Sequence, residues 1–229
     1  LPEPSAVADA DPPGHAEFYD LLRERGIRVL DLEEQFREQR QSADEPLYCL
    51  TDSHWSGFAC ASAARAIAEI VRMETPAERM QLTNVWTTIT FQGDLAQMVG
   101  RSDIPQEQIR VRRVGTPAAG LPGPVPPGGD SPVILLGDSH NLVFHAGGDM
   151  HTVGAGLPDQ LLRELGYPVE LVAVRGSGAT PARVNLYRRA ARNPDYWQGR
   201  RWVVWCFAVR EFTESDGWRK VPVRPPAGG

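Results

Sequence analysis

The feature that most constrains this chain is an apolar run that ends abruptly in small and polar residues, SPVILLGDSH at residues 131–140. Four consecutive aliphatic residues, 133–136, are typical of a strand covered on both faces, as in the parallel sheet of an α/β domain. Gly137 then allows a sharp turn at the carboxyl edge of the strand, where open α/β sheets usually place their chemistry. Ser139 is therefore predicted to lie on a turn at that edge, either as a nucleophile or as an ordinary turn residue.

The rest of the chain alternates between short β-rich runs and segments with helical spacing. Helices are expected at 16–24, 33–40, 56–72, 158–165 and 181–192, and strands at 27–32, 46–50, 85–91, 133–136, 169–174 and 201–209. The order strand, loop, helix in the second half predicts a parallel, doubly wound sheet. One domain is expected over residues 16–214, with a loose lead at 1–15, a Pro/Gly-rich surface loop at 115–130 and a tail at 215–229.

Composition excludes several classes of protein. A chain of 229 residues with 41% hydrophobic content can fill the core of one α/β domain. The net charge of −5 and the lack of a basic tail argue against a general nucleic-acid binder. No run approaches the roughly 18 apolar residues of a membrane span. The first residue is Leu1 rather than Met, so a processed or truncated chain is expected. Three cysteines allow at most one internal disulfide, and Cys206, in an apolar run, is expected to be a buried, inert thiol.

A second polar motif, Asp52-Ser53-His54, stands between an expected strand and an expected helix. A serine hydroxyl becomes a nucleophile only when a base removes its proton, and an imidazole does so when a carboxylate fixes its tautomer. Asp52 and His54 supply both groups from one loop. The alternative is that Asp52 or Ser53 caps the helix beginning near residue 56 and that His54 is merely polar.

A third motif, Gly176-Ser177-Gly178, follows the strand expected at 169–174. Its backbone N–H groups could stabilise negative charge on an attacked carbonyl oxygen. The alternative is an ordinary tight turn.

These motifs together resemble a known family. Gly137-Asp138-Ser139 resembles the first block of SGNH-type hydrolases, and residues 176–180 resemble the second block. The Asp-x-His pair precedes the serine here, and this permuted order is similar to SGNH-like polysaccharide O-acetyltransferases of the alginate-acetylation type, AlgX and AlgJ. The resemblance covers about residues 16–214, including 19–32, 93–95 and 203–207. It implies a three-layer α/β domain with a mostly parallel sheet flanked by helices and with the catalytic motifs in permuted order.

The resemblance also implies roles for individual residues. Ser139 would carry the acetyl group, His54 would act as base and then acid, and Asp52 would orient His54. The N–H groups of Ser139 and Gly178 would bind the oxyanion. Further candidates are Arg210 for the oxyanion or substrate, His140 for the pocket wall, and, more weakly, Arg175 and Trp55 for substrate. Arg210 could instead be an exposed arginine at a strand end.

Other polar groups give weaker signals. His140, His145, Asp149 and His151 lie within twelve residues, but their irregular spacing matches no tetrahedral metal site, so no metal and no cofactor is expected. Residues 175–201 contain seven arginines and one acid, which could attract an anionic polysaccharide or simply form a solvated helix face.

The predicted function is transfer of an acetyl group through Ser139 to hydroxyls of an extracytoplasmic polysaccharide such as an alginate-like exopolysaccharide. The resemblance implies a periplasmic or extracytoplasmic location and an acetyl donor supplied through a membrane-bound O-acyltransferase. No carbohydrate-binding module is expected after Glu214. Two alternatives are a carbohydrate acetylesterase that uses the same residues with water as acceptor, and a non-catalytic polysaccharide-binding subunit.

Overall fold

The computed structural model describes residues 15–42, 45–71, 79–101, 103–176, 178–213 and 217–223. A parallel sheet of three strands, in the order β4-β3-β5, stands at its centre, and a two-stranded antiparallel ribbon, β1-β2, stands apart from it. In chain order the elements are α1 (His15–Glu24), α2 (Glu33–Ser42), α3 (Gly57–Val71), β1 (Thr83–Phe91), α4 (Asp94–Val99), β2 (Glu107–Gly115), β3 (Val133–Gly137), the 3-10 turns η1 (Ser139–Asn141) and η2 (Gly148–Met150), α5 (Leu157–Leu165), β4 (Glu170–Ala173), α6 (Thr180–Arg192), β5 (Trp202–Cys206) and α7 (Arg210–Thr213).

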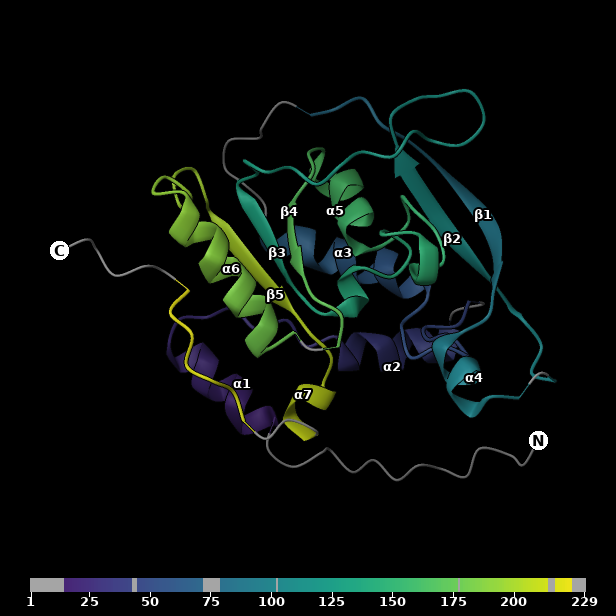
Figure 1. The fold of residues 1–229 in the computed structure, drawn as a ribbon, viewed down its shortest axis with the longest axis horizontal. Coiled ribbons are helices and arrows are strands. Elements are labelled where there is room, and N and C mark those ends of the chain that lie inside the picture. The colour runs from purple at the N-terminus through teal and green to yellow at the C-terminus, as the bar shows by residue number, and fades with distance from the viewer. Residues whose placement is uncertain are drawn as a thin grey trace.

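The central strand β3 is buried along its whole length because helices cover both faces of the sheet. Val133 and Leu135 pack into one core with residues of α3 and α5. Ile134 and Leu136, which point the other way along the pleat, pack into a second core with α6. Each such side chain contributes about 1.5–3 kcal/mol on burial. Figure 1 shows α6 on one side of the sheet and α3 and α5 on the other. The predicted three-layer α/β fold with a parallel sheet is confirmed.

One end of the β1-β2 ribbon carries two buried residues. β1 and β2 pair in register from Thr83 opposite Gly115 to Phe91 opposite Glu107. Phe91 and Glu107 are both buried at the end of the ribbon. This end therefore places one ring and one carboxylate beside the loop that precedes α3.

Two expected strands are absent from the described structure. Residues 27–32 run without strand pairing between α1 and α2, with Ile27 49% and Leu30 36% exposed. Residues 46–50 form only an isolated bridge, Tyr48 opposite Trp55. Both segments have apolar residues at strand-like spacing, but a strand also needs a partner with free backbone groups, and local pattern does not supply one. The run expected at 201–209 is a strand only to Cys206.

The three cysteines carry free thiols, and Cys49 and Cys60 are buried. Burial raises the pKa of the Cys206 thiol, and the nearby Asp138 carboxylate raises it further. Cys206 is half-buried rather than fully buried as expected, but a thiol held in its neutral form is a poor nucleophile.

Gly137 is required because other groups approach it closely, rather than for a positive φ. A Cβ atom at this position would lie 2.0 Å from the carbonyl oxygen of Cys206 and 2.1 Å from Nδ2 of Asn141. Asn141 Nδ2 donates to that same carbonyl at 2.9 Å, so the contact ties the turn after β3 to β5.

We expect Gly137→Ala to destabilise the fold by about 1–3 kcal/mol or more, because a backbone oxygen and a buried amide must move to admit the methyl group. Urea unfolding measures this change. Gly129→Ala is the control, since a Cβ there would meet nothing within 4 Å. Equal stability of the two variants would contradict the close-packing account.

Candidate active site

The predicted nucleophile lies on the turn that leaves β3. Ser139 begins η1 and is 6% exposed. Asp138, which is fully buried, fixes the turn: its Oδ1 accepts from the His140 N–H at 2.9 Å and its Oδ2 from the Ala208 N–H at 2.9 Å. Burial by itself raises the pKa of the Asp138 carboxyl, but hydrogen bonding and charge from His140 outweigh it, and the pKa lies below its usual range. An ionised, fully bonded Asp138 therefore holds Ser139 at the carboxyl edge of the sheet.

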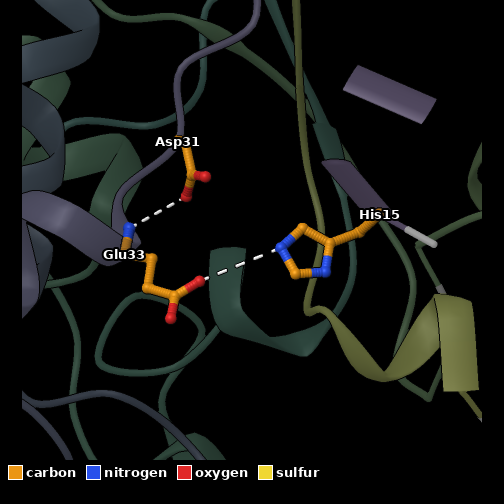
Figure 2. Close-up of side chains that lie close together, drawn as sticks. All are labelled: His15, Asp31 and Glu33. Atoms are coloured by element: carbon orange, nitrogen blue, oxygen red, sulfur yellow. Dashed lines mark hydrogen bonds and ion pairs between the residues drawn. The ribbon is translucent and has the colours of Figure 1, made fainter. Parts of the chain in front are cut away.

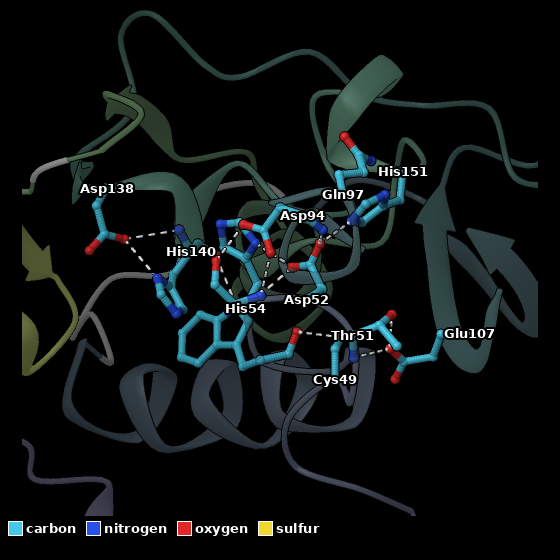
Figure 3. A network of polar contacts seen from close by, with 12 residues as sticks. Cys49, Thr51, Asp52, His54, Asp94, Gln97, Glu107, Asp138, His140 and His151 are labelled. Carbon is cyan, nitrogen blue, oxygen red and sulfur yellow. Dashed lines mark hydrogen bonds and ion pairs between the residues drawn. The ribbon is translucent and has the colours of Figure 1, made fainter. Parts of the chain in front are cut away.

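The loop before α3 brings Asp52 and His54 into direct contact, as predicted. Asp52 Oδ1 lies 2.6 Å from Nδ1 of His54 and accepts from the His54 N–H at 3.0 Å. The second oxygen, Oδ2, accepts from the Asp94 N–H at 3.0 Å and lies 2.9 Å from Nε2 of His151. Figure 3 shows Asp52 between the two histidines. Burial raises the pKa of Asp52, but hydrogen bonds from His151, His54 and the Asp94 N–H outweigh it and hold that pKa well below its usual range.

Two further carboxylates hold this loop in place. Asp94 accepts from the Ser53 N–H at 2.7 Å and from its hydroxyl at 2.6 Å. Glu107 accepts from the Leu50 N–H at 2.7 Å and from the N–H and hydroxyl of Thr51, each at 2.8 Å. The geometry of the Asp-His pair is therefore fixed by α4 and by the end of the β1-β2 ribbon (Figure 3).

The helix-capping alternative for Asp52 and Ser53 does not describe this loop. Ser56 caps α3: its Oγ accepts from the Ala59 N–H at 3.2 Å. Asp52 and Ser53 are committed to His54 and Asp94 instead.

The loop and the turn meet at Trp55 and His140. The indole Nε1–H of Trp55 donates to the carbonyl oxygen of His140 at 3.0 Å, and the rings of His54 and His140 lie 5.0 Å apart. Nε2 of His54 is buried, and no described residue hydrogen-bonds it. A buried polar nitrogen without a partner is unusual and calls for an explanation. The imidazole is thus held at Nδ1 and left available at Nε2, beside the turn that carries Ser139.

Trp55 differs from its predicted role. It is 4% exposed and its N–H is already used, so it braces the site and offers no face for stacking on a sugar ring. The apolar body of an indole is more stable in the core, with its N–H bonded. The ring of His140 lies between those of His54 and Trp55, with centroids 5.0 and 5.6 Å away, and its role as a pocket wall stays a prediction.

The loop at residues 176–178, which was predicted to bind the oxyanion, has hydrogen-bond partners within the protein that were not predicted. The Gly178 N–H donates to Oε1 of the buried Glu211 at 2.8 Å, so it is not free to meet an oxyanion in this structure. Arg210 donates from Nη2 to the carbonyl oxygen of Gly176 at 3.2 Å and so holds the same loop. Ser177 lies outside the described residues. The loop does approach the nucleophile turn, since a Cβ at Gly178 would lie 3.1 Å from the Asp138 nitrogen.

Several arginines of the 175–201 stretch have partners within the protein. Arg175 pairs with Asp149 of η2, and Arg189 and Arg200 pair with the buried Glu170. The guanidinium of Arg183 lies over the rings of Trp205 and Trp218. These contacts favour a structural role for the stretch over a groove for an anionic polymer.

Two groups of side chains in the described structure have metal-ligand atoms within 4.8 Å of one another: His15 with Asp31 and Glu33, and Asp52 with His54 and Asp94. In the first group Asp31 accepts from the Glu33 N–H at 2.9 Å, and His15 Nε2 lies 3.9 Å from a Glu33 oxygen (Figure 2). The second group is the hydrogen-bonded loop described above. Hydrogen bonds or ion pairs within the protein join members of both groups.

Sequence reasoning assigned no role in the site to Asp94, Glu107, Asp138 or Glu211, and it considered His151 only as a metal ligand. A weak signal existed for Asp94 and Asp138, which lie within motifs that carried the family resemblance. Glu107 and Glu211 reach the site from distant parts of the chain and carry no local signal.

The sequence matches a known protein family over most of its length. The sequence model of the family "SGNH hydrolase-like domain, acetyltransferase AlgX" matches residues 3–209. A search of curated proteins found no match.

Solved structures share the fold. The O-acetyltransferase domain of Pseudomonas putida AlgJ is similar with a TM-score of 0.63 and 18% identity over 89% of this chain. Pseudomonas aeruginosa AlgX is similar with a TM-score of 0.56 and 18% identity over 85% of this chain. The chain spans 66% of the first structure and 44% of the second. With a family match over most of its length, this chain belongs to the AlgX family of SGNH hydrolase-like acetyltransferase domains.

Proposed function

We propose that this protein transfers an acetyl group, through an acyl-enzyme on Ser139, to hydroxyls of an extracytoplasmic polysaccharide. One observation carries the proposal: His54 is bound at Nδ1 by the Asp52 carboxylate at 2.6 Å while its buried Nε2 has no described partner. A general base needs a fixed tautomer and a free nitrogen near the nucleophile, and the first two conditions are met at His54. No hydrogen bond joins His54 Nε2 to Ser139 in the described structure, so the proposal requires the Ser139 hydroxyl to reach Nε2 when the donor binds.

The reaction has two balanced halves. In the first, Nε2 of His54 takes the proton of the Ser139 hydroxyl as Oγ bonds to the acetyl carbonyl carbon, and the donor's leaving group departs with that proton. In the second, His54 takes the proton of a sugar hydroxyl as its oxygen attacks the acetyl carbon, and the proton returns to Ser139 Oγ. Asp52 keeps the proton on Nδ1 and stabilises the imidazolium in both halves.

Negative charge on the acetyl oxygen needs fixed donors. The Ser139 N–H, at the start of η1, is one candidate. The Gly178 N–H becomes a second donor only when Glu211 releases it, because the carboxylate now accepts its hydrogen bond. Arg210 stands next to Glu211 in α7 and donates to the same loop, so a role in substrate or oxyanion binding depends on that loop too.

The acetylesterase alternative uses the same acyl-enzyme with water as the acceptor. Ser139 is 6% exposed and the His54 side chain 7% exposed, so the access of bulk water to these two residues is limited. Exclusion of water favours transfer whenever a hydroxyl acceptor is bound.

We expect acidic oligosaccharides, such as those of alginate, to divert acetyl groups from water. The protein is incubated with p-nitrophenyl acetate with and without oligosaccharide, and acetylated sugar and free acetate are both measured. The proposal predicts acetylated sugar and a fall in free acetate, both lost in Ser139→Ala. Free acetate alone would identify an esterase for these substrates, and nitrophenol release no faster than in Ser139→Ala would favour a binding subunit.

Family membership supports two further parts of the proposal, the acetyl donor and the location. An acetyl donor supplied through a membrane-bound O-acyltransferase, and a periplasmic or otherwise extracytoplasmic site of action, belong to this proposal. No helix in the described part of the chain has both the length and the apolar character needed to cross a bilayer.

A further inference from the structure

We infer that His151 is a positioning residue of the active site: it anchors the Asp52 carboxylate so that the opposite oxygen faces His54. The inference rests on the proposed function, because it assigns His151 a place behind the Asp52–His54 pair. It extends the three predicted catalytic residues to a chain of four, His151, Asp52, His54 and Ser139.

The backbone at His151 has a strained conformation that the local sequence does not predict. Its φ is 71° and its ψ −47°, and the Thr152 N–H donates to the Met150 carbonyl across it at 2.9 Å. This is a γ-turn with positive φ, a rare conformation that costs a non-glycine residue on the order of 1–3 kcal/mol. Glycine would relieve the strain, yet a histidine stands here. Backbone strain of this kind is common at functional sites, where the side chain must point in one direction.

The surroundings of the ring fix that direction. The His151 side chain is 7% exposed, and its ring stacks on Phe91 with centroids 4.0 Å apart and planes 27° apart. Phe144 closes another side, with centroids 5.9 Å apart. Nε2 points out of this apolar slot toward Asp52 Oδ2 at 2.9 Å (Figure 3). A ring packed among apolar groups with one nitrogen on a carboxylate is set to donate one hydrogen bond.

Asp52 depends on this bond. The carboxylate side chain is 1% exposed and receives donors on both oxygens: His54 on Oδ1, and His151 with the Asp94 N–H on Oδ2. Asp94 supplies a backbone donor whose place is set by α4, so His151 is the side chain that fixes Oδ2. Without it, Asp52 loses one of the bonds that keep it ionised, and the Asp94 N–H alone holds Oδ2, so the carboxylate is less firmly oriented toward His54. A base whose tautomer and orientation drift loses turnover rather than substrate affinity.

Two variants of His151 separate its role as a hydrogen-bond donor from the packing of its ring. His151→Phe keeps a ring for Phe91 and removes the donor. His151→Gln keeps an N–H donor at comparable reach and removes the ring. Both keep the same strained backbone, since neither is glycine. His145→Phe is the matched control, because His145 also contacts a buried carboxylate, Asp159 at 2.9 Å, outside the site.

We expect His151→Phe to lower kcat about 10–100-fold, as for loss of an outer-shell partner of a metal-bound histidine. KM should stay within about 2-fold, because His151 contacts no substrate in the proposed mechanism. His151→Gln should recover most of the lost kcat, and His145→Phe should leave kcat unchanged. Urea unfolding of each variant shows whether activity merely follows stability.

A second readout does not depend on acetyl transfer. In ¹⁵N-histidine NMR of the free protein, the His54 Nδ1–H resonance should shift in His151→Phe and stay near the wild-type position in His151→Gln and His145→Phe. Unchanged His54 resonances and kcat in His151→Phe would overturn the inference. Equal losses in the Phe and Gln variants that follow their stability would also overturn it. A wild type that forms no Ser139-dependent acyl-enzyme would refute the proposed function, while the NMR shifts would still decide the role of His151.

Discussion

Replacing Ser139 with alanine is expected to lower kcat for acetyl transfer by roughly 10⁴- to 10⁶-fold, the loss typical of removing a serine nucleophile. Ser139 stands at the end of the buried strand β3, where Asp138 fixes the turn. Release of nitrophenol from p-nitrophenyl acetate measures the loss. Alanine removes only an oxygen, so the fold should persist.

The control for this variant is Ser42→Ala. Ser42 ends α2, and within the described residues its hydroxyl donates to the Glu38 carbonyl on the surface, so its loss should leave turnover within about 2-fold of wild type. A folded Ser139→Ala protein that keeps more than about a tenth of the wild-type rate would remove Ser139 from the mechanism.

Asp52→Asn is expected to lower kcat by about 10⁴-fold, because an amide cannot accept hydrogen bonds on both ends as the carboxylate does. Either the nitrogen faces Nδ1 of His54 and imposes the wrong tautomer, or it faces His151 and Asp94 and meets two donors. Steady-state turnover against pH measures the effect. Asp195→Asn, an exposed acid in the loop after α6, is the control and should change little.

The same variant should also be less stable, and the difference should depend on pH. The folded-state pKa of Asp52 lies below its unfolded value of about 3.9, so its contribution to stability is complete above that pH and is lost as pH falls toward the folded pKa. The gap in unfolding free energy between wild type and Asp52→Asn should therefore shrink below about pH 4. A gap that stays constant down to pH 2, or a kcat within 10-fold of wild type, would contradict this role for Asp52.

Local sequence was sufficient to identify the groups that lie close together in the chain. Ser139 was expected at the end of a buried strand, and an unbroken aliphatic run such as 133–136 can be satisfied only between two layers. Asp52 and His54 are separated by one residue, so a single turn brings Oδ1 of Asp52 to the backbone N–H and to Nδ1 of His54. The spacing made their contact possible, but Asp94 and Glu107, which hold the loop in place, come from distant parts of the chain.

Contacts between distant segments could not be predicted in this way. His151 reaches Asp52 across 99 positions, and only the γ-turn and the Phe91 stack give its ring the required direction. Glu211 reaches the Gly178 N–H from a four-residue helix that carries no sequence pattern of its own. The sequence identified the Gly178 N–H as a donor, but the side chain that accepts from it depends on how α7 packs.

The expected strands at 27–32 and 46–50 were wrong for a related reason. Apolar alternation shows that a segment has one face suited to burial, but it does not show which partner pairs with its backbone. The segment at 46–50 makes a single bridge to Trp55 and then gives its Leu50 and Thr51 N–H groups to Glu107. Its backbone is used to hold the Asp52 loop rather than to extend the sheet.

The most direct test of the account is the intact mass of the protein after brief exposure to p-nitrophenyl acetate, for the wild type, Ser139→Ala and His54→Ala. The account predicts a transient gain of one acetyl group that maps to Ser139 in the wild type and is absent from both variants. Wild-type protein that is folded and remains unmodified, or that carries the acetyl group on another residue, would contradict it.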